Sequence, residues 1–311
     1  MSDPRTAESR YDALFATVFP LYQQGRYVDA LARLDEDPGD LAEWSAMVTE
    51  IRACLLALTG RIDAALATLQ GGLDAGEWWD PHMLDRDPDL AKARDLPGYD
   101  AVLRESGARA AAYNSAASPG PPVVVHPAGT ARGVLVVLHG SGGRPAKTAE
   151  QWSAAGRAGV VVLAARSSHR TTPATASWVD ESTAARDLRS ALDHLDADTA
   201  ALPVIAAGFS AGGRAALQWV VAADPVPVHG AVLVAPSLLA EQVPQEIESP
   251  LHGLALVGGD DPMGVGMLTR GDALRRAGLV IEELPGVGHA YPDDFDARLT
   301  RALDELLTRT D

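Results

Sequence analysis

The chain has 311 residues, of which 47% are hydrophobic and 22% charged, a balance typical of a globular protein with a sizeable core. Its net charge of −16 disfavours nucleic acids and anionic membranes as partners, because like charges repel. The single cysteine, Cys54, excludes an intrachain disulfide, and its apolar neighbours favour a buried, inert thiol. Neither a signal peptide nor a membrane-spanning run is visible, so we expect a cytoplasmic protein.

Residues 9–75 are predicted to be helical, because apolar side chains recur there at spacings of three and four. The segment GRYVDAL at 25–31 recurs as GRIDAAL at 60–66, a period of 35 residues. This period resembles the tetratricopeptide unit of about 34 residues. Since about three such units are normally needed to bury a core, we expect the module to pack on the domain that follows.

An acidic run at 85–89 follows this module and invites interpretation as a calcium loop. That interpretation fails, because Leu90 stands where the turn glycine belongs and Leu96 where the bidentate glutamate belongs. The sequence therefore predicts no metal site. The neighbouring Trp78 and Trp79 are interpreted as an anchor against the second domain.

A further helix, about 95–112, is predicted to close a helical domain over 1–112. Residues 113–121 are rich in turn formers and predict a linker. From 122 to 311, short apolar runs alternate with helical segments, a pattern typical of an α/β fold with a mostly parallel sheet covered by helices on both faces. The predicted strands are 122–126, 133–138, 159–164, 203–207, 229–234, 251–257 and 280–284.

The motif GFSAGG at 208–213 lies between a predicted strand and an alanine-rich helix. This context is the one that a G-x-S-x-G nucleophile elbow requires, so Ser210 is the candidate nucleophile. A serine on so sharp a turn leaves no room for neighbouring Cβ atoms, which explains Gly208 and Gly212.

The glycine-rich segment HGSGG at 139–143 follows the strand 133–138. A phosphate-binding loop would need glycines at 141 and 146, where the chain has Ser141 and Ala146. We therefore favour an oxyanion loop, with the N–H groups of Ser141 and Ala211 as donors. His139 is expected to hold this loop. Gly142 and Trp178 are candidate substrate contacts.

A serine nucleophile needs a base, which in turn needs an orienting carboxylate. Among eight histidines, His289 stands out because it lies in a glycine-rich loop directly after the last strand. Asp260 and Asp261 follow the preceding strand, and only one of these neighbours can point at His289; the other is expected to cap a turn. The order serine, aspartate, histidine is that of α/β-hydrolases.

Residues 122–311 resemble an α/β-hydrolase of the dienelactone hydrolase and phospholipase/carboxylesterase-like group. The resemblance is carried by HGSGG, GFSAGG, GGDDP at 258–262 and GVGHAYP at 286–292. In that group the aspartate lies three residues after a glycine and precedes a proline, which selects Asp261. The resemblance implies a catalytic triad of Ser210, Asp261 and His289, with no cofactor and no metal.

The favoured function is that of a carboxylesterase or lactonase acting on a small-molecule ester. The alternative is a thioesterase or peptidase whose peptide or carrier-protein substrate docks on the helical module, and a non-catalytic binding protein is a third interpretation. The short connection between 236 and 250 leaves no room for a large lid. We therefore expect the helical module, with the loop 167–180, to cover the site.

Overall fold

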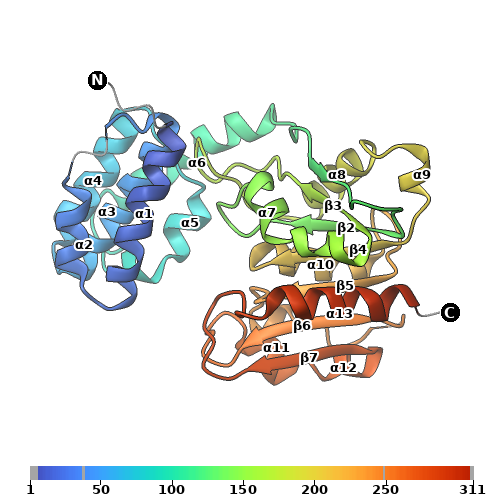
Figure 1. The fold of residues 1–311 in the computed structure, drawn as a ribbon. Helices are drawn as coiled ribbons and strands as arrows, with labels where there is room; N and C mark the ends of the chain where they lie inside the picture. Colours follow the sequence, from blue (N-terminus) through green and yellow to red (C-terminus); the bar gives the residue numbers. More distant parts are fainter. Residues whose placement is uncertain (1–5, 37–38, 248, 309–311) are drawn as a thin grey trace. The chain divides into compact units, whose positions relative to one another are not determined.

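The computed structural model describes residues 6–36, 39–247 and 249–308, and they divide into two compact units (Figure 1). Unit 1 contains the residues up to Ala117 together with Arg170–Thr175, and unit 2 contains the rest. Within these described residues, no helix combines the length and the apolar character needed to cross a membrane.

The regular elements that the structure describes in unit 1 are helices. They are α1 (Ala7–Gln23), α2 (Tyr27–Leu34), α3 (Ser45–Leu58), α4 (Ile62–Asp74), α5 (Pro81–Arg86) and α6 (Tyr99–Ser115), with 3₁₀ turns at Ala42–Trp44 and Pro88–Leu90. Two pairs, α1 with α2 and α3 with α4, form helical hairpins whose members lie in contact.

The 35-residue sequence repeat corresponds to the turns of these two hairpins. Gly25 and Gly60 have φ angles of +70° and +81°, a left-handed conformation that glycine adopts without strain. The amide of the next residue, Arg26 or Arg61, donates to the carbonyl five positions earlier at 2.9 or 2.8 Å. Both helices thus end in the same glycine cap, which accounts for the repeat. The tetratricopeptide resemblance itself stays a prediction.

Trp79 belongs to the core of unit 1. Its side chain is fully buried and its indole N–H donates to the Ala46 carbonyl at 2.8 Å. Trp78 packs against Tyr113 of α6, with ring centroids 5.3 Å apart. The interpretation of Trp79 as an anchor against the second domain is therefore wrong, because this ring fills the interior of its own unit.

Helix α6 extends through Ser115, so the predicted linker at 113–121 begins inside a helix. The side chain of Asn114 explains this extension. Its amide nitrogen donates to the Arg170 carbonyl at 3.0 Å, and its oxygen accepts from the Arg170 amide at 2.8 Å. The Asp80 amide also donates to the Thr171 carbonyl at 2.6 Å. The segment Arg170–Thr175, more than fifty residues further along the chain than α6, therefore completes unit 1.

Unit 2 contains a seven-stranded sheet in the order β1-β3-β2-β4-β5-β6-β7. All neighbouring pairs are parallel except β1 with β3. The strands are β1 (Val123–Val125), β2 (Gly133–Leu138), β3 (Val160–Ala165), β4 (Val204–Phe209), β5 (Gly230–Val234), β6 (Gly253–Gly258) and β7 (Leu279–Leu284). Each overlaps a predicted strand, and the expected α/β class is confirmed.

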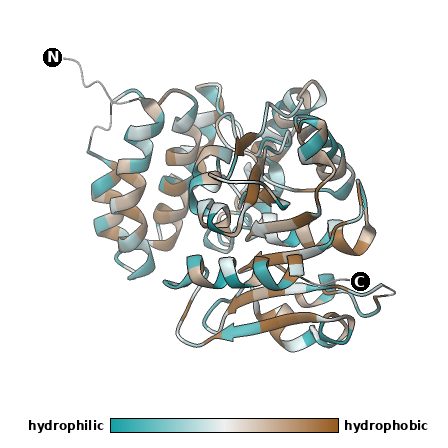
Figure 2. Ribbon diagram, turned by 45° about the vertical axis from the view of Figure 1, so that its right-hand side comes forward, coloured by the Kyte–Doolittle hydropathy of each residue, from teal (hydrophilic) through white to brown (hydrophobic). Residues whose placement is uncertain are grey.

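Helices cover both faces of this sheet. On one face α8 (Glu181–Leu192), α10 (Ala211–Ala222), α11 (Val265–Arg270) and α12 (Asp272–Ala277) pack on alternate strand residues such as Val134 and Val136. The other face carries α7 (Pro145–Gln151), the 3₁₀ turn Ser153–Ala158 and α13 (Phe295–Thr308) over Leu135 and Val137. Figure 2 shows the resulting apolar strands between helices with hydrophilic outer surfaces. A short helix, α9 (Ala197–Ala200), precedes β4 and was not predicted.

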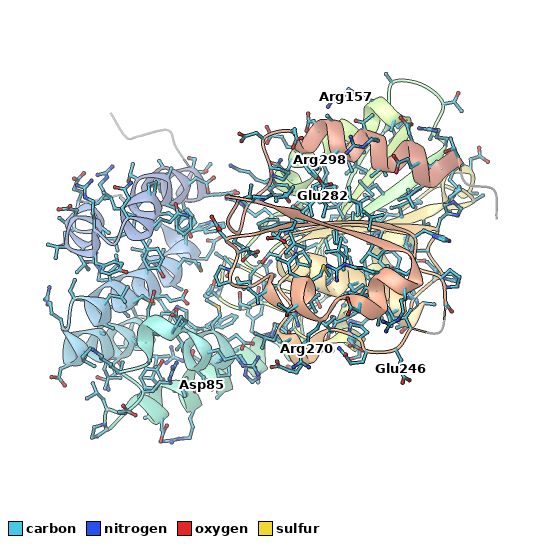
Figure 3. The ribbon with its side chains drawn as sticks, turned by 90° about the horizontal axis from the view of Figure 1, so that it is seen from below. Asp85, Arg157, Glu246, Arg270, Glu282 and Arg298 are labelled. Carbon is cyan, nitrogen blue, oxygen red and sulfur yellow. The ribbon has the colours of Figure 1, made fainter. Side chains whose placement is uncertain are left out.

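The strand β7 lies at the edge of the sheet, where its free backbone groups could pair with another strand, and it carries charged side chains. Glu282 forms an ion pair with Arg298 of α13, which also bonds Asp294 at 2.6 Å (Figure 3). Charged side chains on an edge strand disfavour association with the edges of other sheets. The long connection from β5 to β6 contains, in its described residues, one 3₁₀ turn at Ala240–Gln242.

Candidate active site

Ser210 lies between β4 and α10 in a strained backbone conformation, with φ 55° and ψ −120°. Backbone hydrogen bonds hold this turn. The Ser210 amide donates to the Val234 carbonyl at 3.1 Å, and its own carbonyl accepts from Ser237 at 3.1 Å and Arg214 at 3.0 Å. Such strain persists only where the surroundings impose it, and it is concentrated at functional sites.

Two glycines make the turn possible. A Cβ atom on Gly208 would lie 2.4 Å from the Gly212 carbonyl oxygen, and one on Gly212 would lie 2.1 Å from the Leu138 oxygen. No Cβ atom tolerates either distance. The start of α10 is therefore in direct backbone contact with the end of β2, where the loop 139–143 begins.

A chain of hydrogen bonds joins Ser210, His289 and Asp261. The Ser210 hydroxyl lies 2.8 Å from His289 Nε2, and His289 Nδ1 lies 2.8 Å from Asp261 Oδ2. Asp261 is fully buried, and its Oδ1 accepts from the Met263 amide at 2.9 Å. A buried carboxylate at Nδ1 favours the tautomer whose Nε2 can accept a proton from serine. Asp260, the other candidate, is exposed.

The loops that carry the aspartate and the histidine are packed against each other. A Cβ atom on Gly258, at the end of β6, would lie 2.3 Å from the Val287 oxygen, and the Asp260 amide donates to that same oxygen at 3.0 Å. Because β6 and β7 are parallel neighbours, Asp261 and His289, which follow them, lie at the same edge of the sheet. Such edges, at the carboxyl ends of the strands, are where open α/β sheets bind ligands.

A group of aromatic side chains that the sequence analysis missed supports the histidine. Phe209 stacks on Tyr291, with centroids 4.6 Å apart, and lies 5.1 Å from the His289 ring. The Trp152 indole donates to the Tyr291 hydroxyl at 3.1 Å, and burial raises the pKa of Tyr291. The signal available in the sequence was the position of Tyr291, two residues after the candidate base.

The predicted oxyanion loop lies beside the serine. A Cβ atom on Gly140 would be 3.5 Å from the Ser210 Cβ. Ala211 begins the twelve-residue helix α10, so its amide lies at the positive end of the helix dipole. The Gly142 amide is already engaged, since it donates to the Ala176 carbonyl at 3.0 Å. Gly142 therefore supports the loop through its backbone.

The segment 176–178 holds this loop in place. Trp178 donates its indole N–H to the His139 carbonyl at 2.9 Å, and its carbonyl accepts from Arg214 at 2.7 Å. The Ser141 hydroxyl donates to that of Ser177 at 2.9 Å. Trp178 is only 2% exposed, which argues against the substrate contact expected for this side chain. Its role in the fold is to support the loop.

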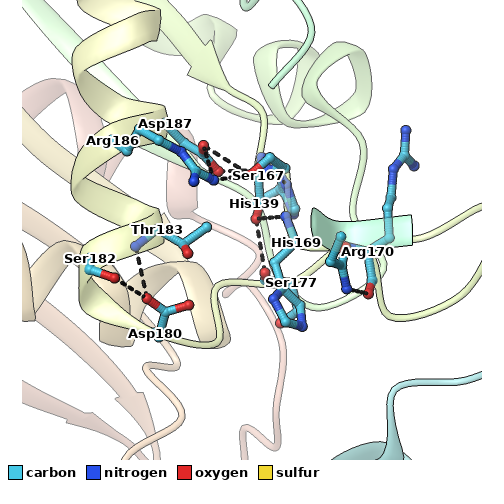
Figure 4. A network of polar contacts seen from close by, with 12 residues as sticks. His139, Ser167, His169, Arg170, Ser177, Asp180, Ser182, Thr183, Arg186 and Asp187 are labelled. Atoms are coloured by element: carbon cyan, nitrogen blue, oxygen red, sulfur yellow. Dashed lines mark hydrogen bonds and ion pairs between the residues drawn. The ribbon is translucent and has the colours of Figure 1, made fainter. Parts of the chain in front are cut away.

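His139 uses both ring nitrogens on the backbone, as expected for a residue that holds the loop. Its Nδ1 lies 2.8 Å from the Gly140 carbonyl and its Nε2 accepts from the Ser167 amide at 3.3 Å. Ser167 in turn donates its hydroxyl to the Ser177 carbonyl at 2.9 Å (Figure 4). These contacts leave His139 in a supporting position, away from proton transfer.

A large hollow lies elsewhere in unit 2. Its volume is about 1010 Å³, and residues at the amino ends of β4, β5 and β6, such as Val204, Gly230 and His252, line it. The candidate nucleophile is at the opposite ends of these strands. This hollow is therefore separate from the candidate site.

Comparison with protein families gives one match. Residues 129–257 match the family described as serine aminopeptidase, S33. This span contains the predicted oxyanion loop and Ser210, and it ends before Asp261 and His289. A search of curated proteins finds no sequence match.

Solved structures with similar folds have low sequence identity to this chain. An uncharacterized protein from Bacillus cereus ATCC 10987 is 18% identical, with a TM-score of 0.50, over 95% of this chain and 99% of its own. Acyl-protein thioesterase 2 of Zea mays is 20% identical, with a TM-score of 0.47, over 60% of this chain and 99% of its own. A Bacillus cereus carboxylesterase is 18% identical, with a TM-score of 0.47, over 63% of this chain and 99% of its own. The first of these matches establishes the similarity of fold.

Proposed function

We propose that this chain, which has the fold of an α/β-hydrolase, is an enzyme that cleaves ester bonds through an acyl-enzyme formed on Ser210. The observation that carries the proposal is the hydrogen-bonded series from Ser210 through His289 to the buried Asp261, with both links at 2.8 Å. Nucleophile, base and orienting carboxylate are the three groups that acyl transfer requires.

In the proposed mechanism, the Ser210 hydroxyl attacks the substrate carbonyl while His289 Nε2 takes its proton. Asp261 keeps the other ring nitrogen protonated and stabilises the imidazolium that forms. The N–H groups of Ser141 and Ala211 stabilise the negative oxygen of the tetrahedral intermediate. His289 then gives the proton to the leaving alcohol, and a water molecule activated by the same base releases the acid.

Two assays test this mechanism. One is labelling by a serine-directed fluorophosphonate, and the other is hydrolysis of p-nitrophenyl esters of increasing acyl length. Wild-type protein should be labelled and should hydrolyse at least one ester, whereas Ser210→Ala should do neither. The matched control is Ser141→Ala, which keeps its backbone N–H and should still be labelled. Labelling that persists in Ser210→Ala would refute the proposed nucleophile.

A second candidate is the cleavage of amide bonds at a peptide N-terminus, and the match of residues 129–257 to a family of serine aminopeptidases favours it. The same three side chains would carry that reaction, with an amine as the leaving group. In this case, and for a thioester on a carrier protein, unit 1 would dock the macromolecular part of the substrate. Aminoacyl p-nitroanilides and acyl thioesters, compared with esters by kcat/KM, distinguish these reactions.

A further inference from the structure

Asp187 of α8 is a fully buried carboxylate that the proposed mechanism does not use. Both of its oxygens bind one residue, since Oδ2 accepts from the Ser168 amide at 2.6 Å and Oδ1 accepts from the Ser168 hydroxyl at 3.0 Å. Arg186 donates to the same hydroxyl at 2.8 Å and forms an ion pair with Asp187 (Figure 4). A buried charge costs free energy unless it is paired and hydrogen-bonded. These contacts offset that cost, and they fix both the backbone and the side chain of Ser168.

Ser167, the residue before Ser168, bonds to the predicted oxyanion loop and to the segment that supports it. Its amide donates to His139 Nε2 at 3.3 Å, and its hydroxyl donates to the Ser177 carbonyl at 2.9 Å. The Ser167 carbonyl and the Ser168 N–H belong to one planar peptide group. Fixing the Ser168 amide therefore restrains the backbone at Ser167 as well.

The contact with Ser167 determines which nitrogen of His139 carries a proton. A backbone amide can only donate, so Nε2 is the unprotonated nitrogen and the proton is on Nδ1. Nδ1 lies 2.8 Å from the Gly140 carbonyl and donates to it. The His139 ring is 1% exposed, so bulk water does not compete for these bonds.

The Gly140 carbonyl belongs to the same peptide group as the Ser141 N–H. The two groups point in opposite directions from one planar unit, so whatever holds the carbonyl also sets the direction of the N–H. The Gly143 amide donates to this carbonyl at 2.9 Å, and the His139 ring supplies a second bond. An oxyanion donor is effective only when it is already aimed at the position where charge develops.

We propose that Asp187 is a positioning residue for the Ser141 N–H. It restrains the backbone at Ser167, whose amide fixes the tautomer of His139, and that ring holds the peptide group of the donor. The inference rests on the proposed function, since acyl transfer generates the negative oxygen that this N–H would stabilise. Asp187 takes part in no bond-forming step.

Steady-state kinetics with the best p-nitrophenyl ester separate positioning from folding. Asp187→Ala removes both acceptors of Ser168, so kcat should fall by about 10- to 100-fold with KM nearly unchanged, a smaller loss than the roughly 10²–10³ for a missing oxyanion donor. Asp187→Asn keeps an oxygen for the Ser168 amide and should retain kcat within about five-fold. The matched control is Asp193→Ala, which truncates an exposed aspartate at the end of the same helix and should behave as wild type. A folded Asp187→Ala with wild-type kcat overturns the proposal.

A trifluoromethyl ketone that mimics the ester reports on the oxyanion, because its adduct with Ser210 carries the negative oxygen. Its inhibition constant should rise in Asp187→Ala by the same factor as kcat/KM falls, as expected when an interaction acts in the transition state. A rise in KM with an unchanged inhibition constant would mean that Asp187 affects substrate binding alone, which overturns the positioning role.

Hydrogen exchange of residues 139–143, followed by mass spectrometry, needs no substrate and separates this inference from the proposed function. Exchange should be faster in Asp187→Ala than in wild type and unchanged in Asp193→Ala; equal rates in all three overturn the inference. If wild type is neither labelled by the fluorophosphonate nor active on any ester, the proposed function fails, and the exchange rates still decide whether Asp187 holds the loop. If Asp187→Ala fails to fold, Ser168→Ala decides, since it removes the hydroxyl that Asp187 Oδ1 binds, and wild-type kcat and exchange in this variant overturn the proposal.

Discussion

Replacing Asp261 by asparagine should disable the proposed catalytic base while leaving the shape of the site intact. Asp261 uses both oxygens as acceptors, one from the Met263 amide at 2.9 Å and one from His289 Nδ1 at 2.8 Å. An amide has only one oxygen. If that oxygen stays with Met263, the NH₂ group faces Nδ1, which must then become an acceptor. The proton moves to Nε2, and His289 can no longer accept one from Ser210.

The size of this effect follows from the alternatives open to the amide. In the flipped orientation its NH₂ group faces the Met263 N–H, and a buried donor without an acceptor costs about 1–3 kcal/mol. The productive tautomer is then a minor population, reduced by roughly 5- to 150-fold. The imidazolium also loses its negative partner. We therefore expect kcat to fall by about 10³–10⁴, the range in which loss of a triad carboxylate lies.

The assay is steady-state hydrolysis of the best p-nitrophenyl ester by Asp261→Asn and by Asp260→Asn. The second variant removes the same charge at an exposed neighbouring position and should keep activity within about two-fold, since exposed charges away from the site contribute little. An Asp261→Asn enzyme within ten-fold of wild type would refute the tautomer argument. A large loss in Asp260→Asn would show that charge alone, and not its position, matters.

Three further predictions follow from contacts in the two units. Gly212→Ala should lower the free energy of unfolding by at least about 1–3 kcal/mol in urea titrations, because its Cβ would lie 2.1 Å from the Leu138 oxygen; an unchanged midpoint would contradict this. Trp178→Phe removes the hydrogen bond to the His139 carbonyl, so kcat for the ester should fall several-fold with little change in KM, and a change in KM alone would favour a substrate contact instead. Burial, with repulsion from Asp87, raises the pKa of Glu50 from 4.5 to about 8. The wild type should therefore keep this contribution to its free energy of unfolding in full below the unfolded pKa and lose up to about 5 kcal/mol as the pH rises through the folded pKa, whereas Glu50→Gln should lack this dependence; parallel pH profiles of the two in urea would refute it.

Local sequence patterns predicted the sheet of unit 2 and the elements that position its site. The strands of a covered parallel sheet are short apolar runs, so each could be located without knowledge of its neighbours. Ser210, Asp261 and His289 each follow such a run. Since parallel strands end at one edge, the order of the runs was enough to expect these side chains near each other.

The features that the sequence analysis missed depend on pairing between distant residues. Trp178 was interpreted as a substrate contact because an isolated tryptophan in a loop gives no indication of its partner; the carbonyl that it binds lies 39 residues earlier. Trp79 and Cys54 likewise acquire their surroundings from helices elsewhere in unit 1. Helix periodicity identifies which face of a helix is buried, but it does not identify the residues opposite.

The contribution of Arg170–Thr175 to unit 1 has a consequence for how the protein is made. Synthesis proceeds from the N-terminus, so the helices up to α6 emerge from the ribosome more than fifty residues before the segment that completes their unit. Buried threonines of that segment, Thr171, Thr172 and Thr175, fill the unit only after β2 and β3 have also been translated. We therefore expect unit 1 to complete its packing only after part of unit 2 has been synthesised, so that the two units mature together rather than one after the other.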